Sequence, residues 1–552
     1  MRWLAIGVVA LVTFAGFLHY FEVHAISMRR AGQRVSLPQH AWSVQRVAEL
    51  EAFPELLSVQ DTPPPSNPQP STIDTKTRAR RDAIVEAFKH SWRGYERHAW
   101  GYDELRPVSN LSNEAWGGFA VTMVDALDTA YIMGLTAEFG RATNWLAANL
   151  TLDRDHFVSV FEHTIRVLGG LLSAYDLSDD VRLLRLAVSA AKALLPAFRT
   201  DDGIPSAQVN TRNGAQRSHG WAPGRILAEA GSVQLEFTRL DTILSEERHA
   251  SLLVDGATRR AIRAAAGSLR LLERYRHAPS GMWPRFLRME GGEGELTVNG
   301  GCDSFYEYLL KLWLLGGRKD EWLQRMYAAS AAGIGRHLTR RCTGAGLLAN
   351  GGALFFGEAR ATTAKATPGK PNGKMEHLAC FAPAMLALGA ARGATPKDAH
   401  TLAEELLESC WSLYADAPTG LAPDTISVTC ELQTRYSIDG AKYSLRPETV
   451  ESLFVMWRLT HDPKHRERGW IIFESLNRWC RTPAGFSGLK DVRAARDQGE
   501  ARRNLDDSMP SFWMAEVLKY LYLLFSDDDV LPLDKWTLNT EAHPLRNAPS
   551  PA

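Results

Sequence analysis

Acidic and polar side chains stand at regular intervals along most of the sequence. Each lies just before or within an apolar segment, and they are spaced by 67, 74, 74, 71 and 68 residues: Glu162, Glu229, Asp303, His377, Glu448 and Glu516. Carboxylates that meet in one pocket are suited to general acid and base catalysis. The spacing predicts a repeated unit of about 70 residues, each contributing one polar side chain.

Each unit has room for two helices and their loops. Apolar residues recur at helical spacing in residues 157–175, 303–315, 450–459 and 511–525, and strand-like alternation is scarce. We therefore expect an all-α body of six or seven helical hairpins over about residues 78 to 540. If the hairpins close into a ring, the polar residues converge on a central pocket. The alternative is an all-α solenoid in which carboxylates merely begin helices, where the helix dipole favours them.

Longer stretches of the sequence resemble the class I α-mannosidases, glycoside hydrolase family 47. The similar blocks come in family order and include SVFEHTIRVLGGLLSAYD (159–176), CDSFYEYLLKLW (302–313), EHLACF (376–381), LRPETVESLF (445–454) and NTEAHPLR (539–546). The resemblance implies an (α/α)7 barrel, a toroid of seven helical hairpins, that binds one Ca2+ at its base. It also implies removal of terminal α-1,2-linked mannose from high-mannose N-glycans, with inversion at the anomeric carbon.

Inverting hydrolysis needs a carboxylic acid on the leaving oxygen and a carboxylate that activates water on the opposite face. By the resemblance, Glu162 is the proton donor, and Arg166 lies four residues later on the same helical face. Glu448 and Asp303 are the two candidates for the base, and the sequence leaves both open. Asp424 stands where the family usually has Glu, and its shorter side chain leaves its role as an acid open.

Further residues match the family's sugar site and its metal site. The predicted substrate-binding residues are Arg166, Glu229, Glu236, His377, Phe512, Glu516 and Glu541. By the resemblance, Thr540 is the Ca2+ ligand, and its hydroxyl and backbone carbonyl are hard oxygen donors of the kind that this ion prefers. Each of these residues, taken singly, also has an ordinary structural interpretation. The prediction therefore rests on the group.

The N-terminus carries a separate signal. Residues 3–21 hold no charged side chain, and as a helix they are about 28 Å long, enough to cross a bilayer. They predict a signal anchor, with a cleaved signal peptide and secretion as the alternative. Five prolines between residues 60 and 73 predict an extended stem. We expect residues 1–24 to be the cytosolic tip and anchor, 25–77 the stem, 78–545 the catalytic barrel and 546–552 a tail.

Charge says little about topology or partners. Arg29, Arg30 and Arg34 follow the apolar run and Arg2 precedes it, so charge counting does not support a lumenal barrel. The lumenal glycan substrate implied by the resemblance does support one, as a type II membrane protein of the endoplasmic reticulum or Golgi. Because 63 basic residues balance 63 acidic ones, nucleic acid is not an expected partner. We expect a monomer.

Six cysteines lie in the second half of the chain, without the spacing of a zinc site. Pairing of sequence neighbours would close loops of about 30 to 50 residues, by joining Cys302 to Cys342, Cys380 to Cys410 and Cys430 to Cys480. Other pairings are open, and the resemblance supports only the second of these three. Two sequons, at Asn110 and Asn149, permit N-glycosylation.

Two other functions fit the sequence. A glycan-binding quality-control factor of the degradation-enhancing type shares the barrel and needs no proton transfer. A different helical-toroid glycosidase or polysaccharide lyase would keep its activity when calcium is chelated. The joint presence of Glu162, Asp303, Glu448 and Thr540 favours the Ca2+-dependent hydrolase.

Overall fold

The computed structural model describes residues 73–252, 254–288, 292–343, 353–362, 365, 367–431, 435–494 and 502–549. The predicted anchor and all but the last five residues of the predicted stem lie outside the described residues. Within the described ranges, no helix is both long and apolar enough to cross a bilayer.

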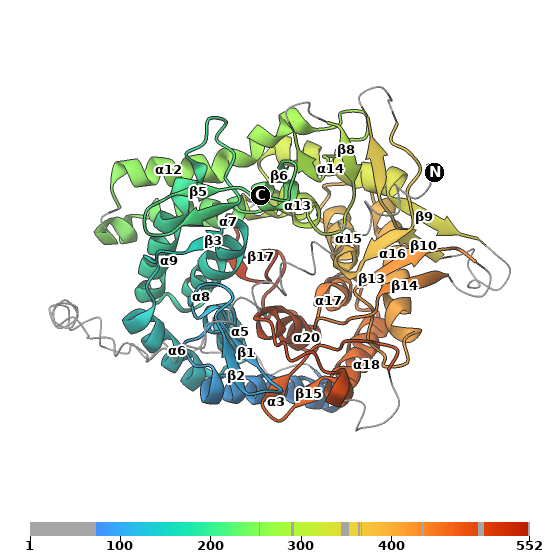
Figure 1. Cartoon of the computed structure of the whole chain (residues 1–552), viewed down its shortest axis with the longest axis horizontal. Coiled ribbons are helices and arrows are strands. Elements are labelled where there is room, and N and C mark those ends of the chain that lie inside the picture. The colour runs from blue at the N-terminus through green and yellow to red at the C-terminus, as the bar shows by residue number, and fades with distance from the viewer. Residues whose placement is uncertain are drawn as a thin grey trace, which may run out of the picture. The chain divides into compact units, whose positions relative to one another are not determined.

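Seven helical hairpins of the described chain form a ring (Figure 1). The inner helices are α4 (Val121–Asp125) with α5 (Leu127–Ile132), α7 (Val160–Glu162) with α8 (Gly169–Ser178), α10 (Leu227–Gly231) with α11 (Gln234–Leu244), α13 (Asp303–Leu315), α15 (Ala382–Ala391), α17 (Glu448–Thr460) and α20 (Leu518–Leu524). The first six are followed by the outer helices α6 (Thr136–Asn149), α9 (Val181–Leu194), α12 (Gly256–Gly267), α14 (Glu321–His337), α16 (Asp398–Ala415) and α18 (Pro463–Trp479). The seventh, α20, packs against α3 (Thr75–His98), and the ring closes there. The predicted (α/α)7 barrel is confirmed.

Burial separates the two layers. In the inner helix α13, every residue from Ser304 to Leu315 is buried, because neighbours enclose it on all sides. In the outer helix α12, only Ile262 and Ala265 are buried. The sequence difference between an apolar and an amphipathic helix thus sets the layer to which each helix belongs.

Short antiparallel strands connect the helices. Six sheets have two strands: β1 (Glu104–Arg106) with β2 (Leu111–Asn113), β6 (Arg225–Ile226) with β7 (Phe286–Leu287), β8 (Gly294–Leu296) with β11 (Ala359–Ala361), β9 (Thr339–Cys342) with β10 (Ala353–Phe356), β15 (Arg481–Thr482) with β16 (Gly485–Phe486), and β17 (Trp536–Leu538) with β18 (Pro544–Arg546). Two sheets have three strands. In one, β4 (Gln208–Asn210) lies between β3 (Phe157–Ser159) and β5 (Gln216–Arg217), and in the other, β13 (Thr425–Val428) lies between β12 (Lys374–Glu376) and β14 (Tyr436–Gly440). Strands of two to five residues are too short to show the alternation by which strands are recognised in a sequence.

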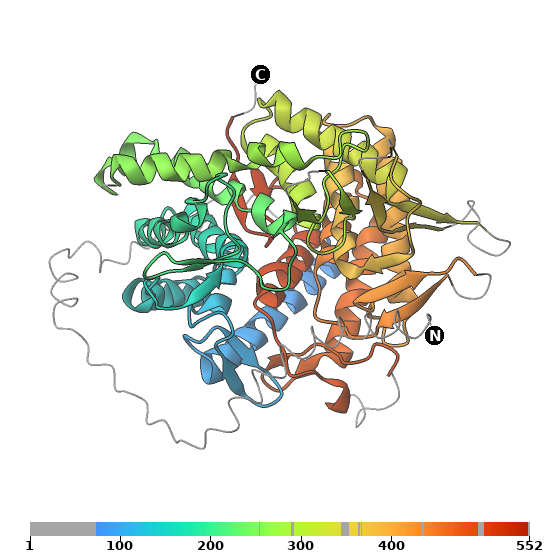
Figure 2. The ribbon, with the colours of Figure 1, turned by 45° about the horizontal axis from the view of Figure 1, so that its top comes forward.

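The β17–β18 hairpin enters the ring along its axis (Figures 1 and 2, red). Asn539 shapes its turn, because its Oδ1 accepts the backbone N–H groups of Glu541 and His543 at 2.9 Å each. Its Nδ2 donates to Glu236 of α11 at 2.7 Å. The turn that carries Thr540 is therefore bonded to the inner wall of the ring.

Of the three predicted disulfides, Cys380–Cys410 is correct and the other two are wrong. Cys342 pairs with Cys430, and Cys302 and Cys480 are buried free thiols. Cys342 ends β9 and Cys430 follows β13, and Arg340 of β9 donates to the carbonyl of Val428 at 2.9 Å, so these strand ends lie together. Sequence proximity failed because Cys302 precedes an inner helix and Cys480 follows an outer one.

We predict that a maleimide applied to the denatured, unreduced protein labels Cys302 and Cys480 and none of the other four cysteines, because those four are held in disulfides. Peptide mass mapping reads the labelled positions. A peptide that links Cys302 to Cys342 would contradict the arrangement.

Candidate active site

Glu162 and Arg166 lie on the inner wall at the start of the second hairpin. Ser159 caps the helix by accepting the Glu162 N–H at 3.2 Å, and a π-helical turn, η2 (His163–Leu168), follows. Nε of Arg166 donates to Glu162 at 2.8 Å. Its Nη1 donates to Glu541 in the β17–β18 turn. Arg166 therefore joins the predicted acid to the axial hairpin.

Two aromatic rings flank the Arg166 guanidinium. The ring centroids of Trp116 and Phe512 lie 5.3 and 5.8 Å from its Cζ. Glu104 holds the indole of Trp116 by accepting its N–H at 3.1 Å. Phe512 is half-buried. An exposed ring of this kind suits the apolar face of a pyranose.

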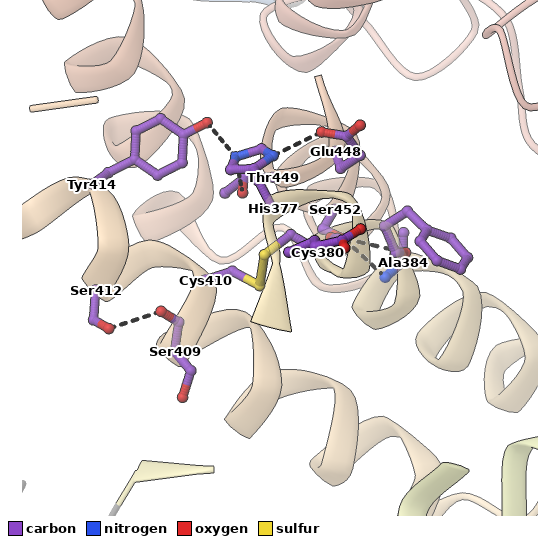
Figure 3. Close-up of a disulfide and its surroundings, with 12 residues drawn as sticks. His377, Cys380, Ala384, Ser409, Cys410, Ser412, Tyr414, Glu448, Thr449 and Ser452 are labelled. Carbon is purple, nitrogen blue, oxygen red and sulfur yellow. Dashed lines mark hydrogen bonds and ion pairs between the residues drawn. A yellow bond between two sulfur atoms is a disulfide. The ribbon is translucent and has the colours of Figure 1, made fainter. Parts of the chain in front are cut away.

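Glu448 begins α17 and is bonded to His377 (Figure 3). Nδ1 of His377 donates to Glu448 at 2.7 Å, and Nε2 lies 2.8 Å from the hydroxyl of Tyr414. Burial alone would raise the pKa of Glu448, but the hydrogen bond and charge of His377, together with the charge of Arg446, hold that pKa below its usual range. Glu448 is therefore kept ionised.

The Cys380–Cys410 disulfide lies close to this pair (Figure 3). It joins the 3-10 turn η6 (His377–Phe381), which begins with His377, to α16, which carries Tyr414. Ser452 of α17 donates to the carbonyl of Cys380 at 2.6 Å. The covalent bond thus fixes His377 relative to Tyr414, and the Ser452 hydrogen bond holds α17, which carries Glu448, against the same turn.

Asp424 lies beside this group and is not a partner of Glu448. It accepts hydrogen bonds from Ser444 at 2.8 Å and from Arg446 at 3.3 Å. Its backbone carbonyl accepts the His377 N–H at 2.9 Å. The observed contacts of Asp424 are those of a residue that positions Arg446 and His377.

Asp303 is the first residue of α13 and is half-buried. Burial raises its pKa to about 7, and the charges of Glu376, Glu307 and Glu448 add to the effect. Its carboxylate accepts the N–H of Ser304 at 2.9 Å, which opposes the shift only in part. Asp303 therefore keeps its proton more readily than Glu448 does.

Glu516 and Glu541 crowd the centre of the site. Glu516 lies in a second π-helical turn, η7 (Trp513–Val517), before α20. Burial holds both pKa values well above their usual range, and the charge of Asp125 adds to the effect on both, although Arg166 opposes it. Glu448 further raises the pKa of Glu516. Inner-helix π-turns thus carry Arg166 and Glu516, in line with the frequent occurrence of such turns at functional sites.

Two predicted substrate residues have other contacts. Glu236 of α11 is buried, accepts hydrogen bonds from Tyr308 at 2.8 Å and Asn539 at 2.7 Å, and has a pKa raised by burial to about 7. Glu229 of α10 is half-buried and bonded to His219 at 2.9 Å. The structure therefore places Glu236 against the axial hairpin and Glu229 on α10, where His219 is its hydrogen-bond partner.

A buried charge network that the sequence analysis missed supports Arg166. His543 lies 3.0 Å from Asp125 and 2.8 Å from Asp128, and Lys519 lies 2.8 Å from Asp128. Asp125 also contacts Arg166 at 3.3 Å. The sequence did contain a sign of this network in the segment VDALDT. Asp125 and Asp128 are three residues apart there, so they lie on one helix face within apolar sequence.

The structure thus brings residues from distant parts of the chain to one axial site. Direct contacts join Glu162, Arg166 and Glu541. The charges of Arg166 and Glu541 couple this group to Glu516, and the charge of Glu448 acts on both Glu516 and Asp303. Thr540 lies in the same axial turn as Glu541 and is half-buried. The arrangement places the ionised carboxylate of Glu448 and the arginine-bound carboxylate of Glu162 on different hairpins. Acid–base catalysis requires two such groups.

Relatives of known family share this architecture. Residues 87–547 match the model of glycosyl hydrolase family 47. The chain is 38% identical over 484 residues to mannosyl-oligosaccharide 1,2-alpha-mannosidase IB of Mus musculus, which covers 86% of this chain and 70% of the relative. It is 38% identical over 477 residues to the endoplasmic reticulum mannosyl-oligosaccharide 1,2-alpha-mannosidase of Mus musculus, which covers 84% of this chain and 68% of the relative.

A solved structure agrees with these matches. The alpha-1,2-mannosidase from Trichoderma reesei superposes with a TM-score of 0.73 at 27% identity, over 85% of this chain and 99% of its own. Fold, site and sequence agree, and the chain belongs to glycosyl hydrolase family 47.

Proposed function

We propose that this glycoside hydrolase removes terminal α-1,2-linked mannose from high-mannose N-glycans, in a Ca2+-dependent reaction that inverts the anomeric carbon. The observation that carries the proposal is the pairing of two carboxylates of different character on separate hairpins of one ring. Glu162 is held by Arg166, and Glu448 is kept ionised by His377. The named activities of the 38% identical relatives support the same substrate.

The geometry supports distinct roles for the carboxylates. Glu162, half-buried and facing the site, donates the proton to the leaving oxygen. Glu448, whose pKa is lowered, takes the proton from the attacking water. Asp303, with a pKa of about 7, is partly protonated at neutral pH and is assigned to holding water or a sugar hydroxyl. Asp424 is assigned to positioning, because its carboxylate is bonded to Arg446 and Ser444.

The residues present fit a bound Ca2+. The surplus of buried carboxylates, which raises the pKa values of Glu516 and Glu541, is charge that a divalent cation at the axial turn would offset. Among the described residues there is no group of three or more His, Cys, Asp or Glu side chains arranged to hold a metal. Thr540, with waters and sugar hydroxyls, would therefore supply much of the coordination. Such an ion orients sugar hydroxyls and water and stabilises developing charge.

We further propose that the protein acts as a monomer in the secretory pathway, with residues 1–24 as a type II anchor and residues 25–77 as the stem. The named location of one relative, the endoplasmic reticulum, supports this compartment. Two disulfides in the described chain are also typical of an oxidising lumen.

The test is release of mannose from a nine-mannose N-glycan by the purified protein, with and without EDTA. We expect release of α-linked sugar as β-mannose, read by NMR, and loss of the activity on chelation with recovery on adding Ca2+. Glycan binding without release would favour the quality-control lectin. Release that persists in EDTA would point to a metal-independent glycosidase.

Changing His377 to Gln should move the acid limb of kcat/KM to higher pH by about one unit or more. His377 lowers the pKa of Glu448, so without it burial dominates and the base takes up its proton at a higher pH. In Tyr414→Phe the Nδ1 contact to Glu448 stays, and we expect a smaller displacement. Equal pH profiles for wild type and His377→Gln would contradict the assignment of Glu448 as the base.

A further inference from the structure

Two lysines are buried inside the ring, and both contact the turn between β17 and β18. Of the lysines in the described ranges, only Lys311 of α13 and Lys519 of α20 are buried. Nζ of Lys311 donates to the carbonyl of Asn539 at 3.1 Å, and Nζ of Lys519 donates to the carbonyl of Ala542 at 2.7 Å. Helices from two different hairpins therefore hold the two ends of one four-residue segment.

Each ammonium group is also paired with a carboxylate. Lys311 donates to Glu307, one turn earlier on the same helix, and Lys519 lies 2.8 Å from Asp128 of α5. Such pairing offsets the cost of burying a charge, but it needs no contact with a backbone carbonyl. The contact that both lysines make with the turn therefore requires its own explanation.

The oxygens of Thr540 differ from those at the two ends of the segment. Within the described ranges, neither the carbonyl nor the hydroxyl of Thr540 takes part in a hydrogen bond. The carbonyl of Asn539 accepts from Lys311 and from the N–H of Ala542. Ala542 has a φ of 59°, which is unfavourable for a residue with a side chain, and Lys519 holds its carbonyl. The lysines thus hold a strained turn in which the Thr540 oxygens stay free for a ligand.

We propose that Lys311 and Lys519 are positioning residues for this turn, and that their hydrogen bonds to the carbonyls of Asn539 and Ala542 preorganise the oxygens of Thr540 for Ca2+. A turn that is already ordered loses less conformational entropy when it binds an ion, so its affinity is higher. The inference rests on the proposed Ca2+ dependence. It adds a role for two lysines that the sequence analysis did not select.

Electrostatics alone makes the opposite prediction. An ammonium group near a divalent cation repels it. If the lysines acted only through their charge, replacing either of them by Met should therefore tighten Ca2+ binding. If they position the turn, the same replacement should weaken it. The sign of the change in Kd separates the two roles.

The experiment measures Ca2+ binding to the EDTA-stripped full chain by isothermal titration calorimetry. We expect Kd for Ca2+ to rise about tenfold in Lys311→Met and in Lys519→Met, because each variant loses a charged hydrogen bond to the turn. The matched control is Lys490→Met, which removes an exposed donor to the carbonyl of Arg503, at 3.0 Å. Its Kd should equal that of the wild type.

A second comparison separates positioning from a weakened fold. Lys311→Met leaves Glu307 buried without this partner, which destabilises the protein. The double variant Lys311→Met/Glu307→Gln removes both charges, so we expect its melting temperature to lie closer to that of the wild type. Its Kd for Ca2+ should nevertheless stay about tenfold above that of Glu307→Gln alone.

Lys311 also allows chemical rescue. A hollow of about 510 Å³ is lined by Lys311, Glu307 and the half-buried Trp536. Propylammonium corresponds to the part of the side chain that is lost in Lys311→Ala, and we expect it to enter this hollow and restore Ca2+ affinity. Lys519 does not line the hollow, so Lys519→Ala should not respond.

Hydrogen–deuterium exchange reads the turn without the ion. The amides of Glu541 and His543, which donate to Asn539, should exchange about tenfold faster in both Met variants. An unchanged or lower Kd for Ca2+ in both variants, or unchanged exchange, would overturn the inference. A wild-type protein that binds no Ca2+ would instead refute the proposed Ca2+ dependence, and the exchange rates would still test the hold on the turn.

Discussion

Glu162→Gln should lower kcat for mannose release by a factor of about 10² to 10⁴ and leave glycan binding near the wild-type value. The amide oxygen of Gln can still accept the hydrogen bond from Nε of Arg166, so the local structure is kept. What is lost is the proton for the leaving oxygen. The two quantities separate in single-turnover release of mannose and in a direct glycan-binding titration.

A matched control exists on the outer layer. Glu321 and Arg325 on α14 form an exposed pair with the same four-residue spacing as Glu162 and Arg166. Glu321→Gln should leave kcat unchanged, because exposed pairs of this kind contribute little even to stability. Wild-type release by Glu162→Gln would remove Glu162 from the role of acid, whatever the behaviour of the control.

Glu448→Gln is the second large effect, again a loss of about 10² to 10⁴ in kcat. The variant cannot take a proton from water, and His377 then faces an amide in place of a carboxylate. The acid limb of kcat/KM that belongs to Glu448 should vanish with it. The profile is measured as initial rates of mannose release across pH.

Stability distinguishes lost chemistry from a lost fold in this variant. The charge of Glu448 raises the pKa values of Asp303, Glu451 and Glu516, so its removal relieves repulsion among buried carboxylates. Its own pKa is nevertheless lowered by His377 and Arg446, so its ionised form adds to stability. Glu448→Gln should therefore melt somewhat below the wild type, in a single cooperative transition in a calorimetric scan. The control for activity is Glu408→Gln. Glu408 lies on the outer helix α16 and is paired with Arg468 of α18, so this variant should keep wild-type activity. If Glu448→Gln released mannose nearly as fast as the wild type, Glu448 would not be the catalytic base.

The ring could be predicted from the sequence because the period of the polar residues equals the length of a helical hairpin. Asp303 and Glu448 begin inner helices, and Glu162 ends one. Each hairpin therefore brings one of these residues back to the inner side of the ring. Helical periodicity is a local property, and the hairpin repeat adds the long-range order.

Other features depend on contacts that no local pattern encodes. Cys342 and Cys430 meet because two strand pairs lie side by side, although 88 residues separate them. The pKa of Asp303 depends on Glu376 and Glu448, which lie far from it in the sequence, as well as on Glu307 of its own helix. The sequence left the choice between Asp303 and Glu448 open for the same reason. Their difference in basicity arises from neighbours that only the folded chain supplies.

The closure of the ring between α3 and α20 has a consequence for biosynthesis. Phe88 and Trp92 on α3 are covered only when segments some 400 residues later have been translated, among them α20 and β16. A nascent chain on the ribosome therefore exposes this apolar side until nearly the whole protein has been made, and such late, long-range pairing is slow. The axial turn with Thr540 follows α20 in the sequence, so the pocket is completed last, and a partly synthesised chain cannot act on glycans.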